Sequence, residues 1–315
     1  MYKLVCYTVL LMIVRCTGKE EIPIFDPDSS PQILFSGGKL TEGPSVDQAG
    51  HLYFSDQPND IIRRINRDGT LDTVLYPSGV TNGIAFDHQG RMLLCQANSH
   101  NYEQDTAAGK RSIVRMENDG SLTVMAAGYN GNRFIAPNDL CVDQQGRIYF
   151  TDPWYPNPKM EKSQPHSGVY RIEGPGEVTL VISDLQRPNG ILITPDNKTL
   201  YVSDRGTQRL HRYQVHPNGS LVHDRVVYDF GDDRGIDGMA IDTTGYIYGA
   251  AGEGETAGVY VIDPERGKLL AYQPFPEMVY NVAFGGEDGK NLYVCSGGSV
   301  YMLRTITQGV VIPVR

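Results

Sequence analysis

Six polar residues recur at one position of a repeated sequence unit, and each side chain carries a carbonyl or carboxylate oxygen. They are Glu42, Asn82, Asn138, Asn189, Asp237 and Asn281, separated by 40, 56, 51, 48 and 44 residues. Hard divalent cations prefer such oxygen ligands, and calcium takes about six to eight of them. Gathering these groups in a narrow space is costly unless something pairs them. The pattern therefore predicts a divalent-cation site.

A simpler interpretation is that these residues only form turns, because Asn-Gly and Asp-Gly are common turn dipeptides. Asn82-Gly83, Asn189-Gly190 and Asp237-Gly238 fit it. A turn would also tolerate Ser, Thr or Lys, yet none of these occupies this position in any of the six units. Glu42, which precedes Gly43-Pro44, is a poor turn former. The set as a whole favours ligands over turns.

The elements that must position these residues are short strands. Each unit continues through an apolar strand and a turn with Asp and Gly, and a second strand then ends near Ser-Asp or Thr-Asp, as in EGPSVDQAGHLYFSD (42–56) and NDLCVDQQGRIYFTD (138–152). Four strands per unit, repeated six times, predict an all-β, six-bladed β-propeller with a central metal-binding channel. The sixth unit lacks one strand, which we expect residues 32–38 (QILFSGG) to supply. The innermost strands line the channel, so one repeat position returns six times around one axis.

Other recurring acidic residues serve as a comparison set. One group precedes a glycine by three residues between the first and second strands, where a hairpin turn is required: Asp47, Asp87, Asp143 and Asp242. A second group ends the second strands: Asp56, Asp152 and Asp204. We predict structural roles for both groups.

The first 18 residues differ from the rest. Lys3 is followed by an apolar run over residues 4–14, which at about 11 residues is shorter than the roughly 20 that span a bilayer. This pattern predicts a signal peptide at 1–18 and an exported protein, periplasmic or extracellular, with the propeller domain over 22–315. Cys16 leaves a lipid anchor open, and Arg15 is unusual at a cleavage site. A cytoplasmic protein with an unprocessed start is the remaining alternative.

Charge and cysteine content limit the partners and the types of cysteine site that we expect. The formal net charge is −9, and no Lys/Arg cluster stands out, so we expect no nucleic-acid partner. No segment predicts a transmembrane span, and nothing indicates the oligomeric state. Cys95, Cys141 and Cys295 lie in apolar strand-like runs without a CxxC motif, so we predict buried free thiols.

The chain after residue 18 resembles the SMP-30/gluconolactonase/LRE-like family, which includes regucalcin-type propeller lactonases. Its most specific motifs are Glu42-Gly43-Pro44, Pro137-Asn138-Asp139-Leu140, Thr151-Asp152-Pro153, Pro188-Asn189-Gly190, Asp237-Gly238-Met239 and NVAFGG (281–286). The resemblance implies a six-bladed propeller that binds calcium, or alternatively Zn²⁺, Mg²⁺ or Mn²⁺, in its channel. It also implies hydrolysis of a lactone ester, such as gluconolactone or another sugar lactone.

When the metal ligands of the family are placed on the matching positions of this sequence, the resemblance implies metal ligation by Glu42, Asn138, Asn189 and Asp237. Asp237 is also the expected catalytic residue, as general base or, in phosphotriesterase-like variants, as nucleophile. Asn138 is a ligand or a substrate contact, and Asn82 and Asn281 are expected to line the channel behind the ligands.

Substrate contacts are expected from residues at the channel mouth. The candidates are Gln96, His100, Trp154 and Tyr155, which follow or end second strands, together with Asn138. The aromatic pair could form a wall for a sugar ring or pack between blades.

Two further functions remain open at this stage. A non-catalytic propeller could use calcium only as a structural pin while it binds sugar or protein, and a metal-dependent phosphotriesterase-like hydrolase would use the same ligands. A metal-free, strictosidine-synthase-like enzyme is disfavoured by the full set of oxygen ligands.

Overall fold

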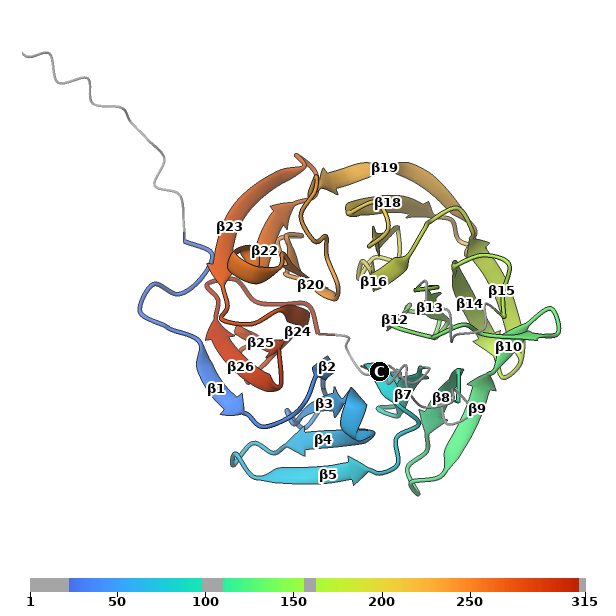
Figure 1. The fold of residues 1–315 in the computed structure, drawn as a ribbon, viewed down its shortest axis with the longest axis horizontal. Coiled ribbons are helices and arrows are strands. Elements are labelled where there is room, and N and C mark those ends of the chain that lie inside the picture. The colour runs from blue at the N-terminus through green and yellow to red at the C-terminus, as the bar shows by residue number, and fades with distance from the viewer. Residues whose placement is uncertain (1–22, 98–109, 156–162, 312–315) are drawn as a thin grey trace, which may run out of the picture.

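The computed structural model describes residues 23–97, 110–155 and 163–311. Six four-stranded antiparallel sheets stand around a central axis, and the only helices in the described residues are two 3₁₀ turns (Figure 1). The predicted six-bladed β-propeller is confirmed.

Each of the first three blades runs from an inner strand outward in chain order. Blade 1 holds β2 (Thr41–Val46), β3 (Leu52–Asp56), β4 (Ile61–Ile65) and β5 (Leu71–Leu75), with the turn η1 (Gln57–Asn59) after β3. Blade 2 holds β6 (Thr81–Phe86), β7 (Met92–Gln96), β8 (Ser112–Met116) and β9 (Leu122–Ala126). Blade 3 holds β12 (Leu140–Val142), β13 (Ile148–Asp152), β14 (Gly168–Gly174) and β15 (Glu177–Ile182), preceded by a small hairpin of β10 (Gly128–Tyr129) and β11 (Asn132–Arg133).

The fourth and fifth blades repeat this order, and the sixth borrows a strand. Blade 4 holds β16 (Pro188–Ile193), β17 (Thr199–Asp204), β18 (Arg209–Val215) and β19 (Leu221–Asp229). Blade 5 holds β20 (Met239–Ile241), β21 (Ile247–Ala251), β22 (Gly258–Asp263) and β23 (Lys268–Pro274), with η3 (Gly254–Thr256) after β21. Blade 6 holds β24 (Val279–Gly285), β25 (Asn291–Ser296), β26 (Ser299–Arg304) and β1 (Gln32–Phe35).

The ring closes through β1. This strand lies antiparallel to β26, with Ile33 opposite Tyr301, so the N-terminal and C-terminal ends of the fold share one sheet (Figure 1). The prediction that residues 32–38 supply the missing strand is confirmed. This pairing covers the edge of β26, which would otherwise leave its backbone N–H and C=O groups without partners.

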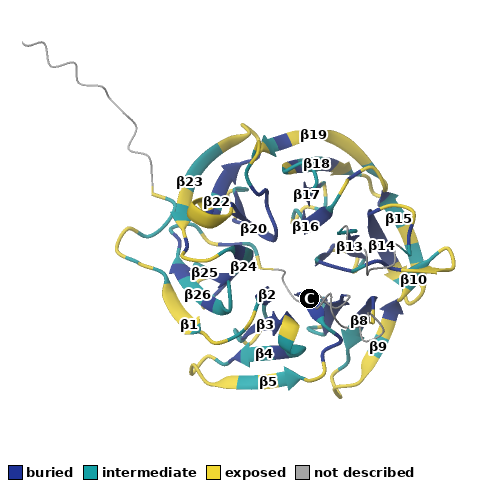
Figure 2. Cartoon of the chain, viewed as in Figure 1, coloured by how far each residue is buried: buried dark blue, intermediate teal, exposed yellow. Residues whose placement is uncertain are grey.

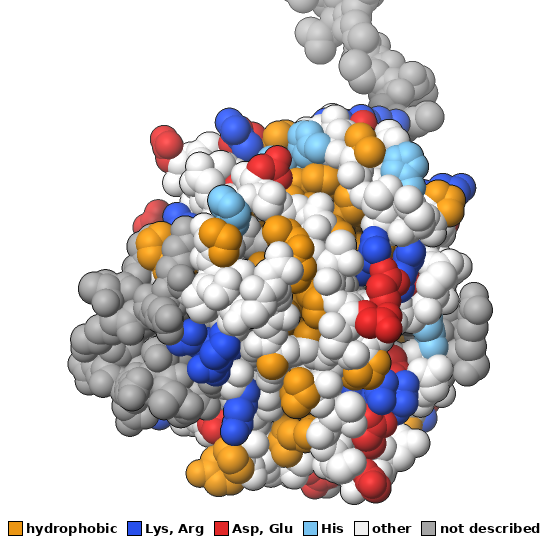
Figure 3. Space-filling model, turned by 90° about the vertical axis from the view of Figure 1, so that its right-hand side faces the viewer, with side chains coloured by type: hydrophobic (Ala, Val, Ile, Leu, Met, Phe, Trp, Pro, Cys, Tyr) orange, Lys and Arg blue, Asp and Glu red, His pale blue; other side chains and the backbone are white. Residues whose placement is uncertain are grey.

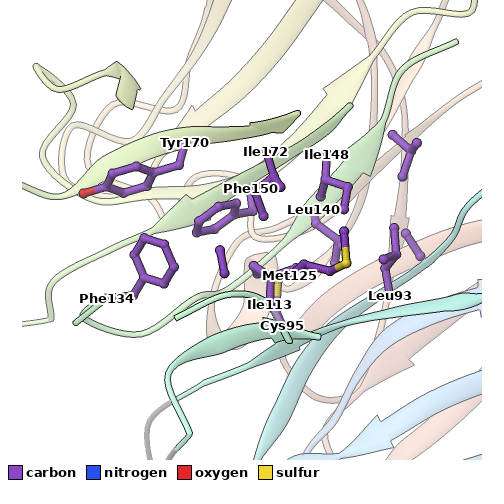
Figure 4. Packing of buried hydrophobic residues seen from close by; sticks show 13 residues of the cluster. Leu93, Cys95, Ile113, Met125, Phe134, Leu140, Ile148, Phe150, Tyr170 and Ile172 are labelled. Carbon is purple, nitrogen blue, oxygen red and sulfur yellow. The ribbon is translucent and has the colours of Figure 1, made fainter. Parts of the chain in front are cut away.

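The core lies between neighbouring blades. Every residue of the second strands β3, β7, β13 and β21 is buried, whereas the outermost strands expose part of their length (Figure 2). Between blades 2 and 3, Phe134 and Phe150 meet edge to face with ring centroids 5.0 Å apart, beside Cys95 (Figure 4). Aromatic pairs of this geometry stabilise a core beyond the area they bury. The three thiols predicted to be buried and free are so.

The acidic residues assigned to structural roles serve the fold. Asp143 accepts the backbone N–H groups of Gln145 and Arg147, both at 2.9 Å, within the hairpin turn. Asp152 accepts those of Ile135 and Ala136, at 2.9 and 2.6 Å. Asp152 therefore holds the loop that leads into the inner strand of blade 3, and the structural interpretation is confirmed for both residues.

The outer rim is a mixed surface. On the side that carries β10 and β15, acidic and basic side chains lie beside one another among other side chains (Figure 3). No helix in the described part of the chain is long and apolar enough to cross a membrane.

Candidate metal and substrate site

The predicted ligands lie where the inner strands are irregular. The β2–β3 register shifts between Glu42 and Ser45, and the β16–β17 register shifts between Pro188 and Ile191, on either side of Asn189. The named strands β12 and β20 begin only after Asn138 and Asp237. A bulge frees a side chain from strict alternation and can re-aim it, which is why bulges occur beside functional sites.

The glycines that follow these residues explain the close spacing of the inner strands. A Cβ on Gly43 would lie 2.3 Å from the Asn82 carbonyl oxygen, and one on Gly190 would lie 2.0 Å from that of Asp237. Asn82-Gly83 and Asn189-Gly190 lie inside β6 and β16. The turn interpretation is therefore wrong for these two dipeptides: their glycines let one blade approach the next.

Five of the six recurring residues line one pocket of about 180 Å³ at the channel axis. The lining is made of Leu40, Glu42, Gln57, Asn82, Asn138, Tyr155, Asn189, Arg205, Arg234, Asp237, Met278 and Tyr280. The five are all buried in the fold. Asn281 lies just behind them and donates from Nδ2 to Glu42 Oε2 at 3.0 Å.

In each anchored side chain one oxygen stays open. Glu42 Oε2 accepts the Gly43 N–H at 2.6 Å, and Asn189 Nδ2 donates to the Tyr155 hydroxyl at 2.8 Å. Asp237 Oδ2 accepts from two arginines. Glu42 Oε1, Asn189 Oδ1 and Asp237 Oδ1 accept no hydrogen bond from the described residues, nor do the side-chain amides of Asn82 and Asn138.

Buried carboxyl groups lie close together along the channel. Burial raises the pKa of Glu42 well above its usual range, and the charges of Asp237 and Asp139 raise it further. Burial likewise raises the pKa of Asp139 to about 7, and the Asp237 charge adds to the effect. Carboxyl groups in this state favour a bound cation, because a positive charge offsets both their desolvation and their mutual repulsion.

The sequence prediction missed Asp139. It stands where glycine follows the ligand position in four other units, at Gly43, Gly83, Gly190 and Gly238. This replacement of glycine by a carboxylate is the feature of the sequence that could have marked Asp139 as a channel residue.

Two arginines at the pocket were also missed. Arg205 donates from Nη1 to Asp237 Oδ2 at 3.1 Å, and Arg234 donates from Nη2 to the same oxygen. Arg205 and Gln57 occupy one repeat position, directly after the Asp that ends a second strand. Comparing the units at that position would have found Arg205 and Gln57.

The donor set fits a hard cation. The described residues contain no group of three or more His, Cys, Asp and Glu placed to hold a metal. A metal in this pocket would therefore depend on two carboxylates and amide carbonyl oxygens. Calcium accepts this set, whereas zinc prefers nitrogen and sulfur ligands.

The predicted substrate contacts fare unequally. Tyr155 lines the pocket, but Trp154 does not. The Gln96 amide is used inside blade 2, where it donates to the Ser78 carbonyl at 2.9 Å and accepts from Ser112 Oγ at 3.0 Å, so it does not reach the pocket. His100 lies outside the described residues.

Comparison with known proteins identifies the family. The model of the SMP-30/Gluconolactonase/LRE-like region matches residues 40–298, which cover all the recurring positions. The chain belongs to the SMP-30/Gluconolactonase/LRE-like family. Among curated SMP-30/Gluconolactonase/LRE-like relatives, it is 29% identical to a gluconolactonase of Zymomonas mobilis, over 91% of this chain and 84% of the relative.

Solved structures agree with this placement. A gluconolactonase from Xanthomonas campestris is 28% identical, with a TM-score of 0.77 over 90% of this chain and 94% of that protein. A regucalcin from Agrobacterium tumefaciens, at 21% identity, covers 90% of this chain and 97% of its own with a TM-score of 0.72, and shares the fold. The resemblance of the motifs to this family is thereby confirmed.

Proposed function

We propose that this protein hydrolyses lactones, in particular sugar lactones, with a divalent cation, calcium, held by Glu42, Asn138, Asn189 and Asp237. The observation that carries the proposal is the set of open oxygens on side chains otherwise fixed by the fold, all lining one pocket. The gluconolactonases of Zymomonas mobilis and Xanthomonas campestris support the reaction class.

Each residue has a defined task in this proposal. A calcium ion held by these four residues would supply Lewis acidity toward the lactone carbonyl oxygen. Asn281 and Tyr155 hold Glu42 and Asn189 so that their free oxygens face the pocket. Asp237 Oδ1 takes a proton from the attacking water, while the two arginines on Oδ2 fix the carboxylate. The water oxygen bonds to the carbonyl carbon, the ring C–O bond breaks, and the leaving ring oxygen takes the proton that Asp237 received from the water, which regenerates the Asp237 carboxylate.

The test combines metal analysis with turnover. We expect stoichiometric calcium in protein purified without chelator, and release of acid from D-glucono-1,5-lactone in a pH-stat. A chelator should abolish turnover and added calcium should restore it. Hydrolysis that persists in metal-free protein would contradict the proposal, and bound calcium without turnover of any aldonolactone would favour a non-catalytic binding protein.

A further inference from the structure

Arg205 and Arg234 are not equivalent, although both contact the same oxygen of Asp237. Arg234 is almost fully buried, and its Nη1 donates to the Val279 carbonyl at 2.8 Å and to that of Gly252. It is thus fixed to the backbone of blades 5 and 6. The Arg205 side chain keeps 19% of its surface exposed, against 2% for Arg234, and among the described residues its guanidinium donates only to Asp237.

This difference points to separate roles. The anchored Arg234 suffices to hold Asp237 in place. Arg205 reaches the same oxygen from blade 4 and lines the pocket, so part of its guanidinium remains available to a ligand. A guanidinium presents its donors in a planar fork that matches a carboxylate.

The charge of the pocket favours an anionic ligand. Its lining carries two negative side chains, Glu42 and Asp237, and two positive ones, Arg205 and Arg234. These cancel before a cation binds, and a divalent cation then adds two positive charges. Asp139, in the channel beside them, offsets at most one of these. An enclosed site with excess positive charge attracts anions and binds them more tightly than neutral analogues.

We propose that Arg205 selects lactones that carry a second acidic group, so the substrate class is the monolactone of a sugar dicarboxylic acid. The free carboxylate of such a lactone would pair with Arg205 while its ring carbonyl faces the open oxygens. Hydrolysis breaks the ring C–O bond, consumes one water and gives an open dicarboxylate. This inference rests on the proposed lactone hydrolysis.

The test uses two lactones that differ at one carbon. D-glucaro-1,4-lactone carries a carboxylate at C6 where D-glucono-1,4-lactone carries a hydroxymethyl group. With calcium present, we expect a kcat/KM ratio of about ten or more in favour of the glucarolactone. Arg205→Gln should bring this ratio close to one, and Arg205→Lys should leave an intermediate value. Any effect through Asp237 falls on both substrates and cancels in the ratio.

Arg209→Gln is the matched control. Arg209 lies in the same blade, but its side chain is 47% exposed and pairs with Asp229 on the surface at 2.8 Å. This variant should keep the wild-type ratio. A wild-type ratio near one, or a ratio that Arg205→Gln leaves unchanged, would overturn the proposal.

A binding measurement separates this proposal from the reaction itself. If neither lactone is hydrolysed, the proposed function fails, and calorimetric titration of the calcium-loaded protein with D-glucarate and D-gluconate still tests Arg205. We expect D-glucarate to bind about ten-fold more tightly to the wild type and with no advantage to Arg205→Gln. Equal affinity of the wild type for both acids would refute the proposal.

Discussion

The two ends of the channel are built from the same six inner strands, yet they differ in nearly every physical respect. At the strand starts lies the pocket of about 180 Å³ with its carboxylates, amides and arginines. Further along the same strands lies a cavity of about 440 Å³. Its lining is mostly apolar, including Ile84, Phe86, Leu192, Ile241 and Phe284, and the C-terminal residues Val310 and Val311 also contribute.

The proposed function places the chemistry in the smaller of these two cavities, and the backbone of the inner strands differs between them. The larger cavity has regular inner strands, whose side chains alternate as the ladder dictates. The smaller pocket lies where the ladders shift, so that polar side chains of successive blades face one axis. The register shifts of these inner strands thus lie at the end of the channel that holds the narrow pocket, and we expect substrate binding and hydrolysis at that end.

The largest effect should come from one substitution made at both ends. Asp237→Asn removes the open carboxylate of the narrow pocket, so we expect calcium binding to weaken and kcat/KM for D-glucono-1,5-lactone to fall by about 10²–10⁴-fold. Asp87→Asn is the control, because Asp87 lines the wide cavity but accepts the Gln89 and Arg91 N–H groups within a turn. It should lower stability by about 1–3 kcal/mol and keep kcat/KM within about two-fold of the wild type. Full activity of Asp237→Asn would sink the assignment.

A second prediction uses the buried carboxyl groups. In the metal-free protein the raised pKa of Glu42, and the pKa of Asp139 raised to about 7, favour the protonated forms in the folded state. Their contribution to stability is therefore complete at low pH and is lost as the pH rises, for Asp139 as it passes about 7. Calcium requires the ionised forms, so the gain in Tm on adding calcium should grow from pH 5 to pH 8. At about 100 times the Kd this gain corresponds to about 2.7 kcal/mol.

Scanning calorimetry with and without calcium checks this expectation. Asp139→Asn is the informative variant, because it removes one titrating carboxyl while it keeps an oxygen for the Leu140 N–H. It should flatten the pH dependence of the metal-free protein. A calcium gain in Tm that is equal at pH 5 and pH 8 would contradict the electrostatic account.

Repetition explains how much of this molecule could be predicted from the sequence. The blade count and the closing strand followed from a unit that recurs six times, and the position of the predicted ligands was visible because all six copies carry an oxygen. The sequence prediction missed Asp139 and Arg205 because the other units carry other residue types at the same repeat positions. Arg234 lies in a loop three residues before Asp237, where the next unit carries an apolar residue, Met278, so this position showed no common chemistry.

Gln96 is a residue that sequence reasoning placed at the substrate site although the structure does not. Its position at the end of a second strand suggested a place near the channel mouth. Whether an amide faces a pocket or the fold depends on the partners that tertiary structure brings to it. Here Ser78 and Ser112 satisfy it, and sequence spacing does not reveal them.

The smallest effect should come from Gln57, on the side of the pocket opposite blade 4. Gln57 is only 1% exposed, and both its amide nitrogen and its amide oxygen lack a partner among the described residues. A buried polar group without a partner costs about 1–3 kcal/mol. Gln57→Leu, of similar size, should therefore raise the free energy of unfolding by about 1 kcal/mol while lowering lactone kcat/KM by about ten-fold, through loss of a hydrogen bond to a substrate hydroxyl.

Gln48→Leu makes the same change at the wide end of the channel, where Gln48 is exposed. It should change neither kcat/KM nor stability by a measurable amount, as urea unfolding and pH-stat assays would show. A stabilised Gln57→Leu protein with unaltered kcat/KM would mean that the amide is a packing defect. A loss of activity combined with a gain in stability would mean that the narrow end gives up stability to keep a polar group free for its substrate.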